Sequence, residues 1–299
     1  MRLLSSQHKG IFYASLSGML YGFLAYFGMM IITEGHSSVF NMLFWRFFVT
    51  TLAFLVILIP AQEVIYDKRQ ILYAFGGAFF YGACAALYFV ASEYIGTGLA
   101  MVIFFTYPTI VALLNWFFHR YKITLFYYIS FILTAVGIFL LSDRSQMTFD
   151  FYGIFLAFLA GISYSFYMLI TKKQAQNLNP ILSSFVISIG NAILFLGLSL
   201  FNHSFFIPTT SLIWINIFGV SIIATVFPLF LLLMSLKYIN STKASIVSVL
   251  EPVVTVIIGV LLLHESLSWI QIIGIVVILA GTLSIQFDKN VDSPKRVQD

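Results

Sequence analysis

The sequence has few charged residues, and this shortage decides its class. Charged residues make up 9% of the 299 residues, hydrophobic residues make up 61%, and the mean hydropathy is +1.00. A soluble core does not need so much apolar sequence, whereas uncharged runs of about 20 residues are typical of membrane-spanning helices. We therefore predict an all-α polytopic membrane protein.

The residues that most catalytic and metal sites need are also scarce at membrane depth. Cys84 is the single cysteine, so disulfides cannot organise the fold, and we interpret it as a packing residue. All five histidines and all six aspartates lie in predicted loops or tails. No HExxH motif, buried aspartate pair, deep Ser/His arrangement or G-x-x-x-x-G-K loop is present. An intramembrane hydrolase and an ATP-driven pump are therefore unsupported, and we expect no enzyme activity, no cofactor and no metal site.

Long apolar runs fill most of the chain. We predict ten membrane-spanning helices, at residues 10–32, 37–59, 70–91, 97–118, 123–142, 153–172, 179–201, 212–236, 242–263 and 267–286. The loops between them are short. A non-transporting membrane receptor or assembly subunit would need a larger docking surface outside the membrane, so we rank that class lower.

The basic residues set the predicted orientation. With a cytoplasmic N-terminus, the inner side holds Arg2, Lys9, Lys68, Arg69, Arg120, Lys122, Lys172, Lys173, Lys237, Lys243, Lys289, Lys295 and Arg296. The outer side holds only Arg144, and Arg46 lies within the second span. This distribution follows the positive-inside rule and predicts that both termini are cytoplasmic. The net charge of +4 therefore reflects topology, and we expect no nucleic-acid partner.

The chain repeats itself. A shift of 143 residues aligns GIFYASLSGMLYGF (10–23) with GIFLAFLAGISYSF (153–166), with eight identities in fourteen positions. A shift of 144 residues aligns Pro108 with Pro252 and Tyr94-Ile95 with Tyr238-Ile239. Each repeat holds five predicted spans, an odd number, so the second copy must be inverted in the membrane. Inverted repeats around a central cavity are typical of secondary transporters. We predict repeats at 1–142 and 143–286 and a cytoplasmic tail at 287–299.

Four stretches in this order resemble one transporter family. They are FWRFF around Arg46, FTYPTIVALL (105–114), LEPVVTVIIGVLLLHESL (250–267) and the following Gly274 and Gly281. Over residues 10–286 the chain resembles the EamA-type branch of the drug/metabolite transporter superfamily. The resemblance implies ten helices, a central cavity, a bacterial inner-membrane location and transport of small organic metabolites, often outward. One departure is visible: relatives often end both the fourth and ninth spans with Gly-Glu, whereas here Arg120-Tyr121 and His264-Glu265 stand at those places.

Glu251 is the only acidic residue deep inside an apolar segment. It lies nine residues from the inner end of its span, which places it about 13 Å into a hydrocarbon core of about 30 Å. A carboxylate at this depth is costly, so it usually faces a cavity, a partner or a substrate path. Glu251 is our candidate for proton coupling and for binding a substrate amine. The alternative is a protonated acid bonded to the carbonyl that Pro252 frees.

Arg46 lies at a similar depth from the outer side. Its guanidinium can hold a carboxylate or phosphate bidentately and always keeps its charge. The alternative is an ion pair with Glu251 or contacts with helix-end carbonyls. If both residues face the cavity, they suit a zwitterion such as an amino acid.

Aromatic residues are the remaining candidates for the cavity wall. Tyr21 and Tyr164 are related by the repeat, Tyr107 occupies the place of Glu251, and Tyr88 is a fourth candidate. Each competes with ordinary packing, because the chain holds 16 tyrosines and 33 phenylalanines. Pro108 and Pro252 are predicted kinks or hinges. Glu265 is interpreted as a capping or loop-ordering residue, and a role in a gate is the alternative.

These features together predict a secondary transporter. We expect export of amino acids or related metabolites by alternating access, coupled to protons through Glu251. The alternative is an importer or antiporter of nucleotide-like or S-adenosyl compounds. The expected partners are a small-molecule substrate, the lipid bilayer and protons, and a monomer suffices for this architecture.

Overall fold

A computed structural model describes residues 6–59, 68–119, 125–141, 150–175, 178–248 and 250–284. Every regular element in these ranges is a helix. The helices are α1 (Ser6–Tyr21), α2 (Leu24–Thr33), α3 (Val39–Leu58), α4 (Lys68–Ile95), α5 (Thr97–Phe104), α6 (Tyr107–His119), α7 (Leu125–Leu141), α8 (Phe151–Ala175), α9 (Pro180–Phe201), α10 (Ser211–Phe218), the π-helix η1 (Gly219–Val226), α11 (Phe227–Tyr238), α12 (Ser241–Val247), α13 (Leu250–Leu262) and α14 (Trp269–Ser284). The predicted all-α membrane fold is confirmed. The predicted tail 287–299 lies outside the described residues.

Several predicted spans consist of two consecutive helices. Joined in this way, the described residues hold eight helical segments long and apolar enough to cross a membrane: Gln7–Thr33, Val39–Leu58, Arg69–Ile95, Thr97–Phe118, Phe151–Lys173, Pro180–Phe201, Ser211–Tyr238 and Ser241–Leu262. The other two predicted spans correspond to α7 and α14, which have 17 and 16 residues. The described parts of these two helices are about 25 Å long, which is less than a bilayer core of about 30 Å. The count of ten therefore stays a prediction.

The two repeats exchange contacts in equivalent pairs. Gly10 meets Tyr238 and Ile239, and Gly153 meets Tyr94 and Ile95 in the same way. A Cβ atom on Gly10 would lie 2.8 Å from Ile239 Cγ2, and one on Gly153 would lie 2.8 Å from Ile95 Cγ2. Each contact from the first repeat to the second has an equivalent contact from the second repeat to the first. This is the pattern that a two-fold axis between the repeats produces, as the sequence predicts.

A second pair of contacts lies deeper in the bundle. A Cβ atom on Gly18 would lie 3.1 Å from the carbonyl oxygen of Ser248, and one on Gly161 would lie 2.9 Å from that of Phe104. Larger side chains would push these helices apart, since small residues let membrane helices approach closely. The bundle centre is therefore built from helices of opposite repeats in direct contact.

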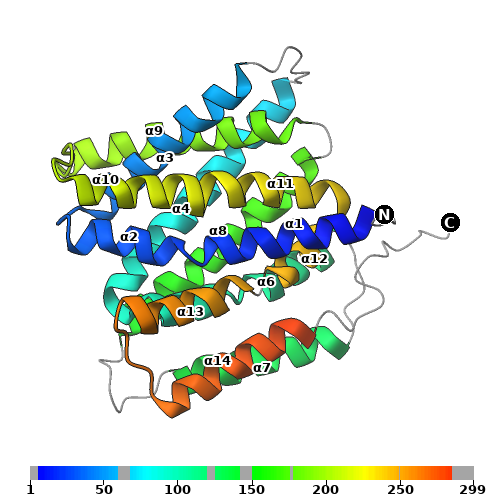
Figure 1. The fold of residues 1–299 in the computed structure, drawn as a ribbon. Helices are drawn as coiled ribbons and strands as arrows, with labels where there is room; N and C mark the ends of the chain where they lie inside the picture. The colour runs from blue at the N-terminus through cyan, green and yellow to red at the C-terminus, as the bar shows by residue number, and fades with distance from the viewer. Residues whose placement is uncertain are drawn as a thin grey trace, which may run out of the picture.

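The helices of the two repeats are arranged around this centre. Helix α4 packs on α8, and α11 packs on α1. Helix α3 packs on α9, and α7 and α14 lie along each other at one side of the bundle (Figure 1). Helix α1 begins and α14 ends at the same end of the molecule (Figure 1). We call this the basic end, because Lys172 bonds there to the carbonyls of Leu236 and Ile239. The other end, where Gly96 turns the chain from α4 into α5 with φ 77°, is called the opposite end.

Helix breaks occur at equivalent places in the two repeats. Helix α5 ends at Phe104 and α6 begins at Tyr107, while α12 ends at Val247 and α13 begins at Leu250. Pro108 and Pro252 each lie in the first turn of the following helix, where the missing N–H removes no intrahelical bond. Proline therefore starts a new half-helix near the bundle centre in both repeats. Whether these breaks act as hinges stays a prediction.

Candidate functional site

A small cavity lies between the two repeats. Its lining residues are Tyr21, Leu24, Arg46, Tyr81, Cys84, Ala85, Tyr88, Met101, Phe104, Tyr164 and Glu251. These residues come from α1, α2, α3, α4, α5, α8 and α13, so both repeats contribute. Its volume is about 30 Å³, roughly the room that one water molecule occupies in the liquid. We call it the central cavity.

Arg46 is buried at one wall of the central cavity, with 1% of its surface exposed. Its Nε donates to Thr225 Oγ1 at 2.8 Å, and its Nη2 donates to Tyr81 Oη at 3.0 Å. The guanidinium also lies over the Phe47 ring, 4.8 Å from the centroid. Nη1 is buried and has no hydrogen-bond partner. The side chain is thus fixed at two nitrogens, and the third is unpaired.

The π-helix η1 holds Arg46 in place from the second repeat. Ser221 Oγ donates to the backbone carbonyl of Arg46 at 3.0 Å, and Thr225 accepts from its side chain. Pro228 lies two residues after the end of η1 and lacks the N–H that would bond to the carbonyl of Ala224, so it favours a wider turn just before it. Such π segments are frequent at functional sites. Here the π-helix supplies two anchors for a buried charge.

Glu251 also lines the central cavity, in the first turn of α13, with 5% of its surface exposed. Within the described part of the chain, its carboxylate has no hydrogen-bond donor and no ion-pair partner. The alternative, in which a protonated Glu251 bonds the carbonyl freed by Pro252, stays a prediction. The N-terminal end of α13 carries a partial positive charge that favours a carboxylate at this place.

Arg46 and Glu251 share the central cavity without pairing. The guanidinium acts electrostatically on the carboxylate, but the two groups form no ion pair in the described structure. The alternative in which they only neutralise each other is therefore absent from this conformation. Two opposite charges line the same cavity, and each keeps unused hydrogen-bonding capacity.

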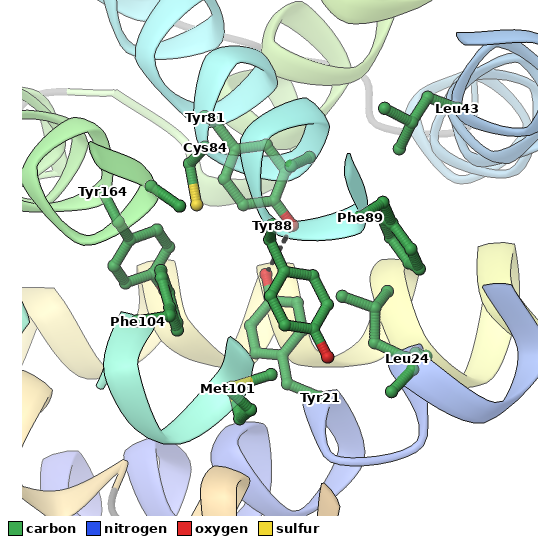
Figure 2. Packing of buried hydrophobic residues seen from close by; sticks show 14 of the residues in the cluster. Tyr21, Leu24, Leu43, Tyr81, Cys84, Tyr88, Phe89, Met101, Phe104 and Tyr164 are labelled. Atoms are coloured by element: carbon green, nitrogen blue, oxygen red, sulfur yellow. Dashed lines mark hydrogen bonds between the residues drawn. The ribbon is translucent and has the colours of Figure 1, made fainter. Parts of the chain in front are cut away.

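Three of the four predicted tyrosines line the central cavity, namely Tyr21, Tyr88 and Tyr164. The hydroxyls of Tyr21 and Tyr81 are 3.0 Å apart and form a hydrogen bond, which is the dashed line in Figure 2. Tyr107 lies behind this wall. Its ring contacts Tyr164 edge-on at 4.6 Å, and its hydroxyl donates to the Ser245 carbonyl at 3.4 Å.

Among the residues of the site that sequence reasoning did not single out, Tyr81, Thr225 and Cys84 carry polar groups. Tyr81 is one of 16 tyrosines, and nothing in its own segment marks it. The repeat offset was the available signal, because a shift of 144 residues places Tyr81 on Thr225, and both bind Arg46. Cys84, interpreted as packing, lines the central cavity with its thiol buried.

Glu265 caps a helix of the other repeat. Its Oε1 accepts from the backbone N–H of Thr97 at 2.6 Å and from the Thr97 hydroxyl, and its Oε2 accepts from the N–H of Gly98 at 3.0 Å. The capping interpretation is confirmed, and the capped helix is α5.

A second hollow lies at the basic end. It has a volume of about 610 Å³ and is lined by Tyr73, Asn115, Phe118, Phe166, Leu169, Ile170, Lys172, Lys173, Asn240 and Ser241. We call it the basic-end groove. Among the described residues no group of histidine, cysteine and carboxylate side chains could hold a metal ion.

Comparison with known proteins decides the family. The sequence profile of the EamA-like transporter family matches twice, at residues 8–143 and 151–287. The chain belongs to this family. It is therefore a multi-pass membrane transporter of the drug/metabolite transporter superfamily, and the resemblance inferred from the motifs is confirmed.

The relatives of this EamA-like transporter carry general names. An uncharacterized transporter of Synechocystis sp. is 27% identical over 225 residues, which cover 72% of this chain and 67% of the relative. The uncharacterized transporter YwfM of Bacillus subtilis is 28% identical over 201 residues, which cover 67% of this chain and 68% of the relative. A protein of known crystal structure shares the fold, with a TM-score of 0.72 at 13% identity over 93% of this chain and 98% of that one.

Proposed function

We propose that this EamA-like transporter moves small zwitterionic metabolites, with amino acids as the first candidates, by alternating access. The observation that supports this most is the pair of unpaired charges in the central cavity. Arg46 Nη1 has no hydrogen-bond partner, and the Glu251 carboxylate has none. A ligand that carries a carboxylate and an ammonium group satisfies both.

Charge balance explains why a zwitterion fits better than a simple ion. A buried charge left without a partner costs several kcal/mol, so a site with one cation and one anion favours a ligand with one of each. An amine alone would leave Arg46 unpaired, and a carboxylate alone would leave Glu251 unpaired. The aromatic rings of Tyr21, Tyr88, Phe104 and Tyr164 then surround the rest of the ligand.

The small volume of the central cavity indicates a contracted conformation. Ligand pockets measure about 300–1,000 Å³, whereas this cavity measures about 30 Å³. An amino acid can enter only if the half-helices move apart. The breaks before α6 and α13 lie beside the cavity and provide places for this movement, because each half-helix can tilt without bending its neighbour.

Glu251 is our proposed coupling group. Its carboxylate makes no hydrogen bond that protonation would break, and a low-dielectric surrounding accepts the neutral form easily. A proton that binds here when cargo leaves, and departs when cargo arrives, would couple the two fluxes. We propose net export across the bacterial inner membrane by a monomer, with the basic end and both termini in the cytoplasm.

A second candidate is an importer or antiporter of nucleotide-like or S-adenosyl compounds. The rings of Tyr21, Tyr81, Tyr88, Phe104 and Tyr164 around the central cavity favour it, since an adenine can stack on such rings. S-adenosyl compounds also carry an amino-acid group that matches Arg46 and Glu251.

Uptake into proteoliposomes tests the proposal. Purified protein is reconstituted, and a labelled amino-acid mixture is offered with and without a pH gradient. Protein-dependent uptake that responds to the gradient is the expected result. No amino-acid uptake by folded protein, together with uptake of a labelled S-adenosyl compound, would replace the first candidate by the second.

A further inference from the structure

The contacts between the two repeats differ between the opposite end and the basic end of the bundle. At the opposite end, Glu265 of the second repeat holds the N-terminus of α5 in the first repeat. Its carboxylate accepts from two backbone N–H groups and one hydroxyl of Thr97 and Gly98. A carboxylate bonded to the N-terminal N–H groups of a helix forms charge-assisted hydrogen bonds, which are about twice as strong as neutral ones.

Two glycines make room for this contact. A Cβ atom on Gly259 would lie 2.6 Å from Glu265 Oε2, and one on Gly98 would lie 3.1 Å from the same atom. A side chain at Gly259 would therefore displace the carboxylate from α5. The bonds between Glu265 and α5 therefore depend on glycine at positions 98 and 259, because a side chain at either position would come too close to the carboxylate.

The first repeat has Tyr121 at the sequence position of Glu265, so it carries no equivalent carboxylate. A shift of 144 residues relates Thr97 to Ser241 and Gly98 to Thr242, at the N-terminus of α12. There the Asn115 amide donates to Ser241 Oγ at 3.2 Å and to Thr242 Oγ1 at 2.8 Å. These are neutral hydrogen bonds, and Asn115 and Ser241 border the basic-end groove of about 610 Å³. Among the described residues, this contact between the repeats is therefore neutral and borders the basic-end groove, whereas the contact of Glu265 at the opposite end is charge-assisted.

The capped helix forms part of the cavity wall. Met101 and Phe104 of α5 line the central cavity, as does Glu251 at the start of α13. Helices α5 and α13 pack against each other, and Glu265 joins the far end of α13 to the start of α5. Opening the cavity towards the opposite end requires these two helices to separate, which breaks the bonds of Glu265.

We propose that Glu265 is a one-sided latch that keeps the transporter closed towards the opposite end and sets the balance between its two open states. This inference rests on the proposed alternating access and on the proposed cytoplasmic location of the basic end. Because only the second repeat carries the carboxylate, an otherwise symmetric scaffold favours opening towards the basic end.

Cys84 provides the test, because it is the single cysteine and lines the central cavity. A charged, membrane-impermeant methanethiosulfonate is applied to right-side-out and to inside-out vesicles, and the rate of Cys84 modification is measured. Glu265→Gln removes the charge and turns one acceptor into a donor that faces Gly98 N–H. We expect this variant to raise the rate from the outside at least about tenfold and to lower the rate from the inside.

Two further variants complete the test. Glu93→Gln removes an exposed carboxylate near the opposite end that caps no helix, and its rates should equal those of wild type. Thr97→Val removes one donor to Glu265 and keeps both backbone donors, so it should change the rates in the same direction by a smaller factor. If Glu265→Gln does not fold, Thr97→Val alone decides.

Unchanged outside rates in Glu265→Gln and Thr97→Val would overturn the latch, and so would equal increases from both sides, which indicate general loosening. The labelling needs no cargo. A protein that fails to move amino acids in the uptake assay can therefore still show the latch, and a protein that transports them can still lack it.

Discussion

Tyr81 and Thr225 occupy equivalent positions in the two repeats and bind the same guanidinium, that of Arg46. Tyr81 Oη accepts from Nη2 at 3.0 Å, and Thr225 Oγ1 accepts from Nε at 2.8 Å. Arg46 therefore lies close to the axis that relates the halves, although only the first repeat carries it. The backbone of the two repeats is nearly symmetric, but the functional side chains are not. The shift of 144 residues aligns Glu251 with Tyr107, which carries no charge.

Arg46→Lys should weaken the binding of zwitterionic and anionic cargo far more than that of cationic cargo. Lysine cannot reach Thr225, Tyr81 and the ligand at once, because it presents one compact ammonium instead of a planar fork. We expect the KM for a zwitterion to rise at least about tenfold in proteoliposome uptake. An equal loss for all cargo would assign Arg46 to structure alone.

Tyr81→Phe should act in the same direction with a smaller effect. It removes the acceptor for Arg46 Nη2 and the hydroxyl bonded to Tyr21, and it leaves the ring in place. A lost hydrogen bond to a charged group corresponds to about 1.5–3 kcal/mol, so the KM should rise about tenfold or more while the thermal midpoint changes little. Tyr152→Phe, at an exposed tyrosine, is the control and should leave the KM unchanged.

Glu251→Gln should abolish proton-coupled accumulation of cargo and leave the exchange of cargo across the membrane. The amide keeps the size of the side chain and one acceptor for an ammonium group, but it cannot carry a proton. We expect gradient-driven accumulation to disappear while counterflow exchange continues at reduced affinity. Accumulation that still follows the pH gradient in this variant would remove Glu251 as the coupling group.

Gly161→Ala should destabilise the fold at a contact between the repeats. The new methyl group would lie 2.9 Å from the Phe104 carbonyl oxygen. Overpacking of this kind costs about 1–3 kcal/mol and outweighs the gain of about 1 kcal/mol from replacing glycine within a helix. The thermal midpoint in detergent should fall.

Gly197→Ala is the matched control for this packing test. No atom lies within 4 Å of a Cβ placed there, so only the gain in helix propensity remains and the midpoint should hold or rise. Equal midpoints for Gly161→Ala and Gly197→Ala would show that the crossing at Phe104 contributes little.

The fold was largely predictable because its signals are local or repeated. Apolar runs indicate the spans, and the offset of 143 to 144 residues indicates two related halves. Pro108 and Pro252 marked the places where α6 and α13 begin. No proline indicates the break between α1 and α2. This break occurs at Gly22, where a Cβ atom would lie 2.5 Å from Val254 Cβ in the other repeat, so it depends on a contact between distant segments.

The site was predictable only as a set of candidates. Depth in the membrane selected Arg46 and Glu251, because buried charge is costly wherever it occurs. Their separation, the role of Tyr81 and the partner of Glu265 depend on how distant segments pack. Glu265 and Thr97 are 168 residues apart, so capping could be inferred from sequence but the capped helix could not.

Protection of Cys84 tests the central claim most directly, since this thiol lies in the cavity that contains Arg46 and Glu251. Purified wild type is treated with a thiol reagent in the presence of an amino acid that it transports, of the methyl ester of that amino acid and of its N-acetyl derivative. The ester lacks the carboxylate, and the N-acetyl form lacks the ammonium group. We predict that the zwitterion slows modification strongly and that each derivative protects far less. A transported amino acid that leaves the rate unchanged, or equal protection by all three compounds, would contradict the account.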